Sequence, residues 1–147
     1  MLLGLRDVGE VRVVGVSLVD GYRGPRKEPS RLLEVIDSED TPSGVTLFEA
    51  CSFTAQWATL VEVRSEPAKV KPDGSVVFDR CVWNPTSAES EITEGLRVAD
   101  VIRSVTVRRS RLSGAVTSMI VLQRGELVVD ASRIVALRYG PPIARPR

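Results

Sequence analysis

Short apolar runs follow one another along the 147-residue chain and predict a protein built mainly from β-strands. Valine is abundant in these runs, and β-branched side chains pack well on a pleated sheet. The run 31–37 is too short for its periodicity to separate a strand from two turns of helix. The other predicted strands are at 11–19, 45–48, 59–64, 76–83, 105–112, 116–123, 127–129 and 134–139.

Turn-forming residues between these runs indicate that neighbouring strands pair as hairpins. Pro72, Asp73 and Gly74 stand in the order of a tight turn, and Gly125 allows the positive φ that a short connection requires. Glycine also precedes a strand at Gly9, but no repeat of fixed period is apparent. The sequence therefore predicts a mainly β fold, a small antiparallel barrel or sandwich, with an α+β arrangement as the alternative.

One short helix is expected near residues 86–103. Thr86, followed three residues later by Glu89, matches a capping box, and negative charge suits the first turns of a helix. Gly95 costs about 1 kcal/mol relative to alanine in a helix interior, so the helix is expected to be short or to break there. A single helical turn is also expected at 130–133, capped by Asp130.

The chain is expected to form a single mainly-β domain over residues 1–139, followed by a Pro/Arg-rich C-terminal tail at 140–147. Proline and charge leave the tail and the loop 23–30 little surface to bury, so both are predicted to be mobile. No apolar run approaches the roughly eighteen residues of a membrane span, and the start lacks the apolar region of a secretory signal. A cytoplasmic location without membrane contact is the expectation.

The chain has no histidine and only two cysteines, which narrows its possible chemistry. Ser-His-Asp and Cys-His catalysis and histidine-containing zinc sites are excluded. Cys51 and Cys81 form no Cys-x-x-Cys pair and are expected to be buried, reduced thiols, with a single Cys51–Cys81 bridge as the alternative. We expect no cofactor and no bound metal.

Charge is sorted along the chain. Residues 28–96 carry thirteen acidic and five basic residues, whereas residues 97–147 carry ten arginines and three acidic residues. The near-neutral total of +1 therefore hides an acidic middle and a basic end. Such asymmetry indicates self-association or an anionic partner. The favoured hypothesis is a non-catalytic binding or assembly protein that forms a homo-oligomer, with acidic regions on basic ones.

The arginines of the basic end support a second hypothesis, an RNA- or DNA-binding small β-barrel. Guanidinium groups present a fork of donors that suits phosphate and stay charged. Arg108, Arg109, Arg111 and Arg124 are the predicted anion contacts because they cluster around the turns of the last β unit. Against this, Tyr139 is the only aromatic after Trp83 on which a base could stack. The wider basic set is Arg103, Arg108, Arg109, Arg111, Arg124, Arg133 and Arg138.

Carboxylates support a third hypothesis, an enzyme that works without histidine. Paired carboxylates can perform acid–base chemistry on glycosidic bonds or hold a hard cation. No calcium-binding loop pattern is present, and carboxylates at such loop positions are normally solvated. The candidate residues are Glu34, Asp37, Glu39, Asp40, Glu62, Glu66, Asp73 and Asp79.

Overall fold

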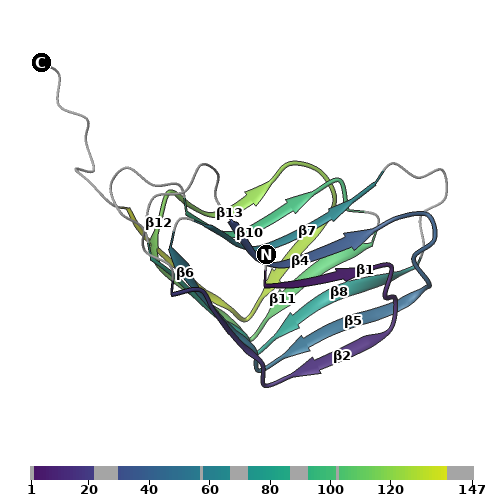
Figure 1. Ribbon diagram of the computed structural model, residues 1–147, viewed down its shortest axis with the longest axis horizontal. Coiled ribbons are helices and arrows are strands. Elements are labelled where there is room, and N and C mark those ends of the chain that lie inside the picture. The colour runs from purple at the N-terminus through teal and green to yellow at the C-terminus, as the bar shows by residue number, and fades with distance from the viewer. Residues whose placement is uncertain are drawn as a thin grey trace, which may run out of the picture.

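The computed structural model describes residues 2–21, 30–56, 58–66, 73–86, 93–101 and 103–138. These residues form fifteen β-strands and no helix, so none of them makes a helix that could cross a membrane. The strands make three five-stranded sheets in which every pairing is parallel. Figure 1 shows the strands stacked in walls around a common interior.

Each sheet takes every third strand of the chain. Sheet A contains, in order, β1 (Leu3–Arg6), β4 (Ser30–Asp37), β7 (Ala58–Ser65), β10 (Glu94–Ala99) and β13 (Ser118–Leu122). Sheet B contains β2 (Val11–Val14), β5 (Gly44–Glu49), β8 (Gly74–Asp79), β11 (Ser104–Arg108) and β14 (Leu127–Asp130). Sheet C contains β3 (Ser17–Val19), β6 (Ser52–Gln56), β9 (Val82–Thr86), β12 (Arg111–Val116) and β15 (Arg133–Arg138).

The chain therefore passes through sheets A, B and C and returns to sheet A one level further along. We call each such passage a rung, so that β1–β3 form the first rung and β13–β15 form the fifth. A chain that coils in this way, with parallel strands about 4.8 Å apart between rungs, is a parallel β-helix. Strand pairing joins each rung only to the next rung, so the strands of the described residues form a linear stack.

The predicted antiparallel barrel or sandwich with one helix is wrong, although the mainly β character is confirmed. The turn at Pro72–Gly74 was interpreted as a hairpin, but β8 begins at Gly74 and pairs in parallel with β5 and β11. Glycine before a strand marks a bend between sheets here, rather than a reversal of the chain.

The helix predicted near residues 86–103 is also wrong in the part of the chain that the structure describes. Thr86 ends β9, and Glu94–Ala99 is β10, so the capping-box pattern opens no helix across the described residues. Residues 87–92 and 102 lie outside the described residues. Strand pairing on both sides of β10, with β7 and β13, outweighs the weak local preference for helix.

Several predicted strands are in fact two strands that meet at a corner between sheets B and C. The run 11–19 divides at Gly15, and the run 76–83 divides at Arg80, each of which has a positive φ. The expected helical turn at 130–133 is the same corner in the fifth rung, formed by Ala131. The five corner residues, which we call the BC corner, are Gly15, Ala50, Arg80, Arg109 and Ala131.

Successive rungs form an internal repeat. The repeat is hard to recognise in the sequence because it has no fixed period. The segments 48–53, 78–83, 107–112 and 129–134 occupy the same place in four successive rungs. They read Phe-Glu-Ala-Cys-Ser-Phe, Phe-Asp-Arg-Cys-Val-Trp, Val-Arg-Arg-Ser-Arg-Leu and Val-Asp-Ala-Ser-Arg-Ile. No period is fixed, as the sequence indicates, because the rungs differ in length while their corners align.

The interior is filled by apolar columns, in which one side chain from each rung lies on the next. Phe48 lies on Phe78 with ring centroids 5.0 Å apart, and Phe53 lies on Trp83 at the same distance. All four rings are fully buried. Burying apolar side chains is the main stabilising term of folding, and here it acts chiefly between rungs.

Candidate functional site

The two outer rungs carry apolar side chains that no described residue covers. Five inward columns are completely buried in the second, third and fourth rungs, whereas their fifth-rung members are partly or largely exposed. Val129, Ile134 and Leu122 are 39%, 43% and 51% exposed, although they continue columns whose third- and fourth-rung members are fully buried. The fifth rung therefore presents an apolar surface together with the open edges of β13, β14 and β15.

The first rung presents a matching apolar surface. Its inward side chains are only partly buried although the residues beyond them on the next rung are almost fully buried. Among the described residues nothing pairs with the outer edges of β1, β2 and β3. Its inward residues are Leu3, Leu5, Val11, Val13 and Leu18.

Solenoid proteins usually end in rungs whose outer face is polar, since an uncovered apolar edge attracts other chains. In the described part of both outer rungs, the side chains that continue the inward columns are apolar instead. These two surfaces, which we call the first-rung face and the fifth-rung face, are the strongest candidate for a functional surface.

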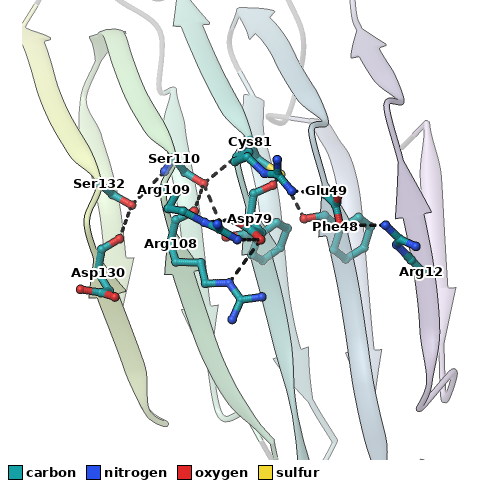
Figure 2. A network of polar contacts seen from close by, with 12 residues as sticks. Arg12, Phe48, Glu49, Asp79, Cys81, Arg108, Arg109, Ser110, Asp130 and Ser132 are labelled. Atoms are coloured by element: carbon teal, nitrogen blue, oxygen red, sulfur yellow. Dashed lines mark hydrogen bonds and ion pairs between the residues drawn. The ribbon is translucent and has the colours of Figure 1, made fainter.

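Hydrogen bonds connect the BC corner from one rung to the next (Figure 2). Ser132 Oγ accepts from the Ser110 amide at 3.1 Å, and Ser110 Oγ accepts from the Cys81 amide at 3.1 Å. Cys81 Sγ in turn lies 3.3 Å from the Phe48 carbonyl oxygen and donates to it. Cys51 holds the same position one rung before Cys81. The corner side chains thus accept amide protons where the chain bends and supplement the backbone hydrogen bonds that continue between rungs there.

Both cysteines are free and buried in this column, which confirms the prediction of reduced thiols over the alternative bridge. Burial raises the pKa of the Cys81 thiol to about 12, and a thiolate is the reactive form. We predict that neither thiol of the native protein reacts with an aromatic disulfide reagent at pH 8 and that both react after unfolding in urea. Rapid reaction of one thiol in the native protein would contradict this prediction. The variants Cys51→Ser and Cys81→Ser would then identify the cysteine that reacts.

Three of the four predicted anion contacts pair with a carboxylate of the same chain in the structure. Arg109 hydrogen-bonds both oxygens of Asp79, and Arg108 Nε lies 3.4 Å from Asp79 Oδ2. Arg124 Nε lies 3.5 Å from Asp100 Oδ1 in an exposed pair. Their assignment as phosphate contacts stays a prediction, but it now requires competition with these pairs.

Arg111, the fourth predicted contact, has no ion-pair partner among the described residues. It lies on the outer face of sheet C and pairs in register with Arg133, which is also exposed and without such a partner. Two positive charges one rung apart repel each other unless an anion lies between them. This column is therefore an exposed positive feature of the basic end that has no ion-pair partner among the described residues.

The Asp79 contacts lead to a pH dependence. The hydrogen bond from Arg109 lowers the pKa of the Asp79 carboxyl below its ordinary value of 3.8. A carboxyl whose pKa is lowered in the folded state stabilises the fold above the unfolded pKa, and that contribution is lost as the pH falls through the folded pKa. We predict that the urea midpoint falls between about pH 5 and about pH 2, and falls less in Asp79→Asn.

The matched control for this experiment is Asp130→Asn, at the position of the same outward column in the fifth rung, where the aspartate is exposed and makes no ion pair in the described structure. The fall of its urea midpoint in acid should remain close to that of the wild-type protein. If the urea midpoint falls equally with pH in Asp79→Asn and in the wild-type protein, the Arg109 contact does not contribute pH-dependent stability.

The candidate carboxylates do not gather into a catalytic pair. Glu34 and Glu62 are adjacent on sheet A, but Arg64 bridges them, with its Nη2 2.9 Å from Glu34 and its Nε 3.4 Å from Glu62. Asp37 is buried at the corner between sheets A and B, Asp79 lies at the BC corner, and Asp73 is exposed. In the described part of the chain no three acidic or cysteine residues come together to hold a metal ion.

Arg103 is the residue that sequence analysis placed most wrongly. It belongs to the basic set predicted to form a surface, yet it is fully buried. Its guanidinium donates to both oxygens of Asp37, at 2.9 and 2.8 Å, and to the Gly9 carbonyl and Thr46 Oγ1, at 3.1 and 2.9 Å. It stands at the corner position that other rungs give to glycine, so the side chain enters the interior there.

Comparison of the chain with models of protein families, with curated proteins and with solved structures finds no match. The fold alone therefore defines the class, a parallel β-helix of five rungs with apolar first-rung and fifth-rung faces.

Proposed function

We propose that the protein is a structural assembly protein whose copies stack end to end through the first-rung and fifth-rung faces. The observation that carries this proposal is the exposure of Leu122, Val129 and Ile134, which extend columns that are buried in the third and fourth rungs. Stacking would cover these side chains and pair the open strand edges. Contacts of this kind repeat from copy to copy and generate linear assemblies.

Charge plays a smaller part in this proposal than the charge asymmetry of the sequence indicates. Arg97 pairs with Glu94, Arg103 with Asp37, and Arg109 with Asp79, all within one chain. In these pairs, charges of the acidic middle and of the basic end neutralise each other within one chain. Assembly would rest mainly on apolar burial and on strand pairing, which salt does not screen.

The test is the molar mass of the wild-type protein by light scattering after size exclusion, at increasing protein concentration and at low and high salt. We expect the mass to rise with concentration and to persist at about 1 M salt, where the Debye length is about 3 Å. A monomer at every concentration would refute the proposal. An oligomer that dissociates fully in salt would point instead to the charge-driven assembly expected from the sequence.

A blocked variant sharpens this test. Lysine at Val129 would put a charge into the stacked interface, whereas the monomer can direct it to water. Val45 is the matched control, since it is 42% exposed against 39% for Val129 but lies in the second rung. We expect Val129→Lys to abolish the rise in mass and Val45→Lys to leave it unchanged.

Nucleic-acid binding is the second candidate function, and the unpaired column of Arg111 and Arg133 favours it. Each phosphate contact contributes about 0.7 to the slope of log K against log salt on a single strand. If this function is correct, the double variant Arg111→Gln/Arg133→Gln should lower the slope by about 1.4 for a single-stranded RNA. An unchanged slope, or no binding by the wild-type protein, would remove this candidate.

A further inference from the structure

We propose that the fifth-rung face of one copy binds the first-rung face of the next, head to tail and with the strands in register. We call this contact a polar joint, because all copies then point in the same direction along the stack. This inference rests on the proposed end-to-end stacking and adds which faces meet. It is based on the residues that would meet when the strand register inside the protein is continued across the joint. Apolar residues would then meet apolar residues, and most charged residues would meet residues of opposite charge.

The apolar columns would continue across such a joint. The register inside the protein assigns each inward residue of the fifth rung to one column, and each column begins at a known residue of the first rung. The same holds in sheets B and C. The resulting matches are Ile120 on Leu3, Leu122 on Leu5, Leu127 on Val11, Val129 on Val13 and Ile134 on Leu18.

Charged positions also match across the joint. Asp7 and Asp100 are corner residues with φ of 53° and 48°, and Arg124 lies beyond Asp100 in their shared column. In the stack Arg124 would lie between Asp100 and Asp7 of the next copy. The one like-charged match is Glu126 on Glu10, at exposed positions where water screens the repulsion.

On the outer face of sheet B, opposite charges would also come together across the joint. Glu49 lies one rung beyond Arg12 and accepts a hydrogen bond from it at 3.1 Å. Asp130 occupies the outward column of Glu49 in the fifth rung. This column begins at Val14, so head-to-tail stacking would place Asp130 on Val14 of the following copy and diagonally beside Arg12, the same offset at which Arg12 reaches Glu49.

The alternative joint, between two fifth-rung faces or two first-rung faces, lacks these matches. It would reverse the strand direction across the joint, whereas every strand pairing within the described rungs is parallel. It would also lack the column continuity of the head-to-tail joint, since the register that continues the columns requires strands that run in the same direction. A head-to-tail joint is heterologous and leaves one free face of each kind, so it propagates.

The experiment uses two variants, each with one face blocked. Val129→Lys blocks the fifth-rung face, and Val13→Lys blocks the first-rung face at the position that would meet Val129. Each protein is measured alone and as an equimolar mixture by light scattering, with circular dichroism and urea unfolding as checks that the fold is retained. Val45→Lys, mixed with wild-type protein, is the control for an added lysine away from both faces.

Head-to-tail stacking predicts that each blocked variant is a monomer and that the mixture gives a dimer, a twofold rise in mass, with no larger species. Dimers formed by one blocked variant alone would overturn the polar joint while leaving end-to-end stacking in place. A wild-type protein that is itself monomeric would instead refute the proposed function. If Val13→Lys unfolds, Leu18→Lys blocks the same face from sheet C and provides the same comparison.

Discussion

Replacing Arg103 with methionine is expected to lower the free energy of unfolding by about 3–5 kcal/mol, because removal of one partner leaves a buried charge uncompensated. Arg103 and Asp37 both have fully buried side chains, and their nitrogen and oxygen atoms lie 2.8 Å apart. The substitution would also remove the donor to the Gly9 carbonyl and to Thr46 Oγ1. The measurement is the urea midpoint followed by circular dichroism.

Two further variants separate the buried charge from lost packing. Arg103→Met/Asp37→Leu removes both charges and should recover much of the loss, since replacing a whole buried ion pair with apolar side chains is often neutral. Arg124→Met breaks a pair whose side chains are 81% and 57% exposed, so it should change stability little. A loss for Arg103→Met as small as that for Arg124→Met would show that the buried pair does not stabilise the coil.

Replacing Gly74 with alanine is the second substitution expected to have a large effect, on the order of 4 kcal/mol from backbone strain and overpacking together. Gly74 has a φ of +122°, where a Cβ atom is strained by about 1–3 kcal/mol. The Cβ would also overlap the carbonyl oxygen of Gly44 in the rung below, and that oxygen belongs to backbone, which cannot rotate away. The rungs would have to separate at this corner to accept it.

Gly15→Ala is the matched control because it adds the same methyl group at another positive φ, of +67°, with nothing within 4 Å of the new atom. Ala50 and Ala131 already occupy the same BC corner position in other rungs. Its cost should be at most about 1–2 kcal/mol, the strain of a left-handed residue. Equal losses for the two variants would show that strain at φ, and not contact between rungs, determines the effect.

The strands were largely predictable from the sequence, whereas their arrangement was not. Apolar runs with abundant valine indicated β8, β11, β14 and β15 because a half-buried strand requires such residues whatever its partner. Partner and direction depend on the corners. Arg80 and Arg109 turn the chain without glycine or proline, so the usual turn signals were absent.

The repeat was present in the sequence but not in its spacing. Phe48, Phe78, Val107 and Val129 begin equivalent segments separated by 30, 29 and 22 residues, because the connections between sheets differ in length. Alignment of short segments, such as the Cys51 and Cys81 corners, would have found it. Periods of 20 to 50 residues are the mark of solenoids.

The candidate surfaces were predictable only in part. Charge sorting suggested self-association, but it could not show that Arg109 and Asp79 would pair within one chain. The buried position of Arg103 had no local signal, since its partner Asp37 is 66 residues away. The first-rung and fifth-rung faces become visible only once the coil is known. Of the two segments predicted to be mobile, the tail at 140–147 and all of the loop 23–30 except Ser30 lie outside the described residues, and Ser30 begins β4.

The most direct test of end-to-end stacking is the axial subunit repeat of the wild-type assembly, measured by electron cryomicroscopy or fibre diffraction. Five rungs at about 4.8 Å each predict a subunit repeat of about 24 Å. The spacing of about 4.8 Å between strands should give a strong signal along the same axis. An axial repeat of about 48 Å would indicate alternating joints and contradict the polar stack. Particles without strand spacing along the axis, or monomers alone, would contradict stacking itself.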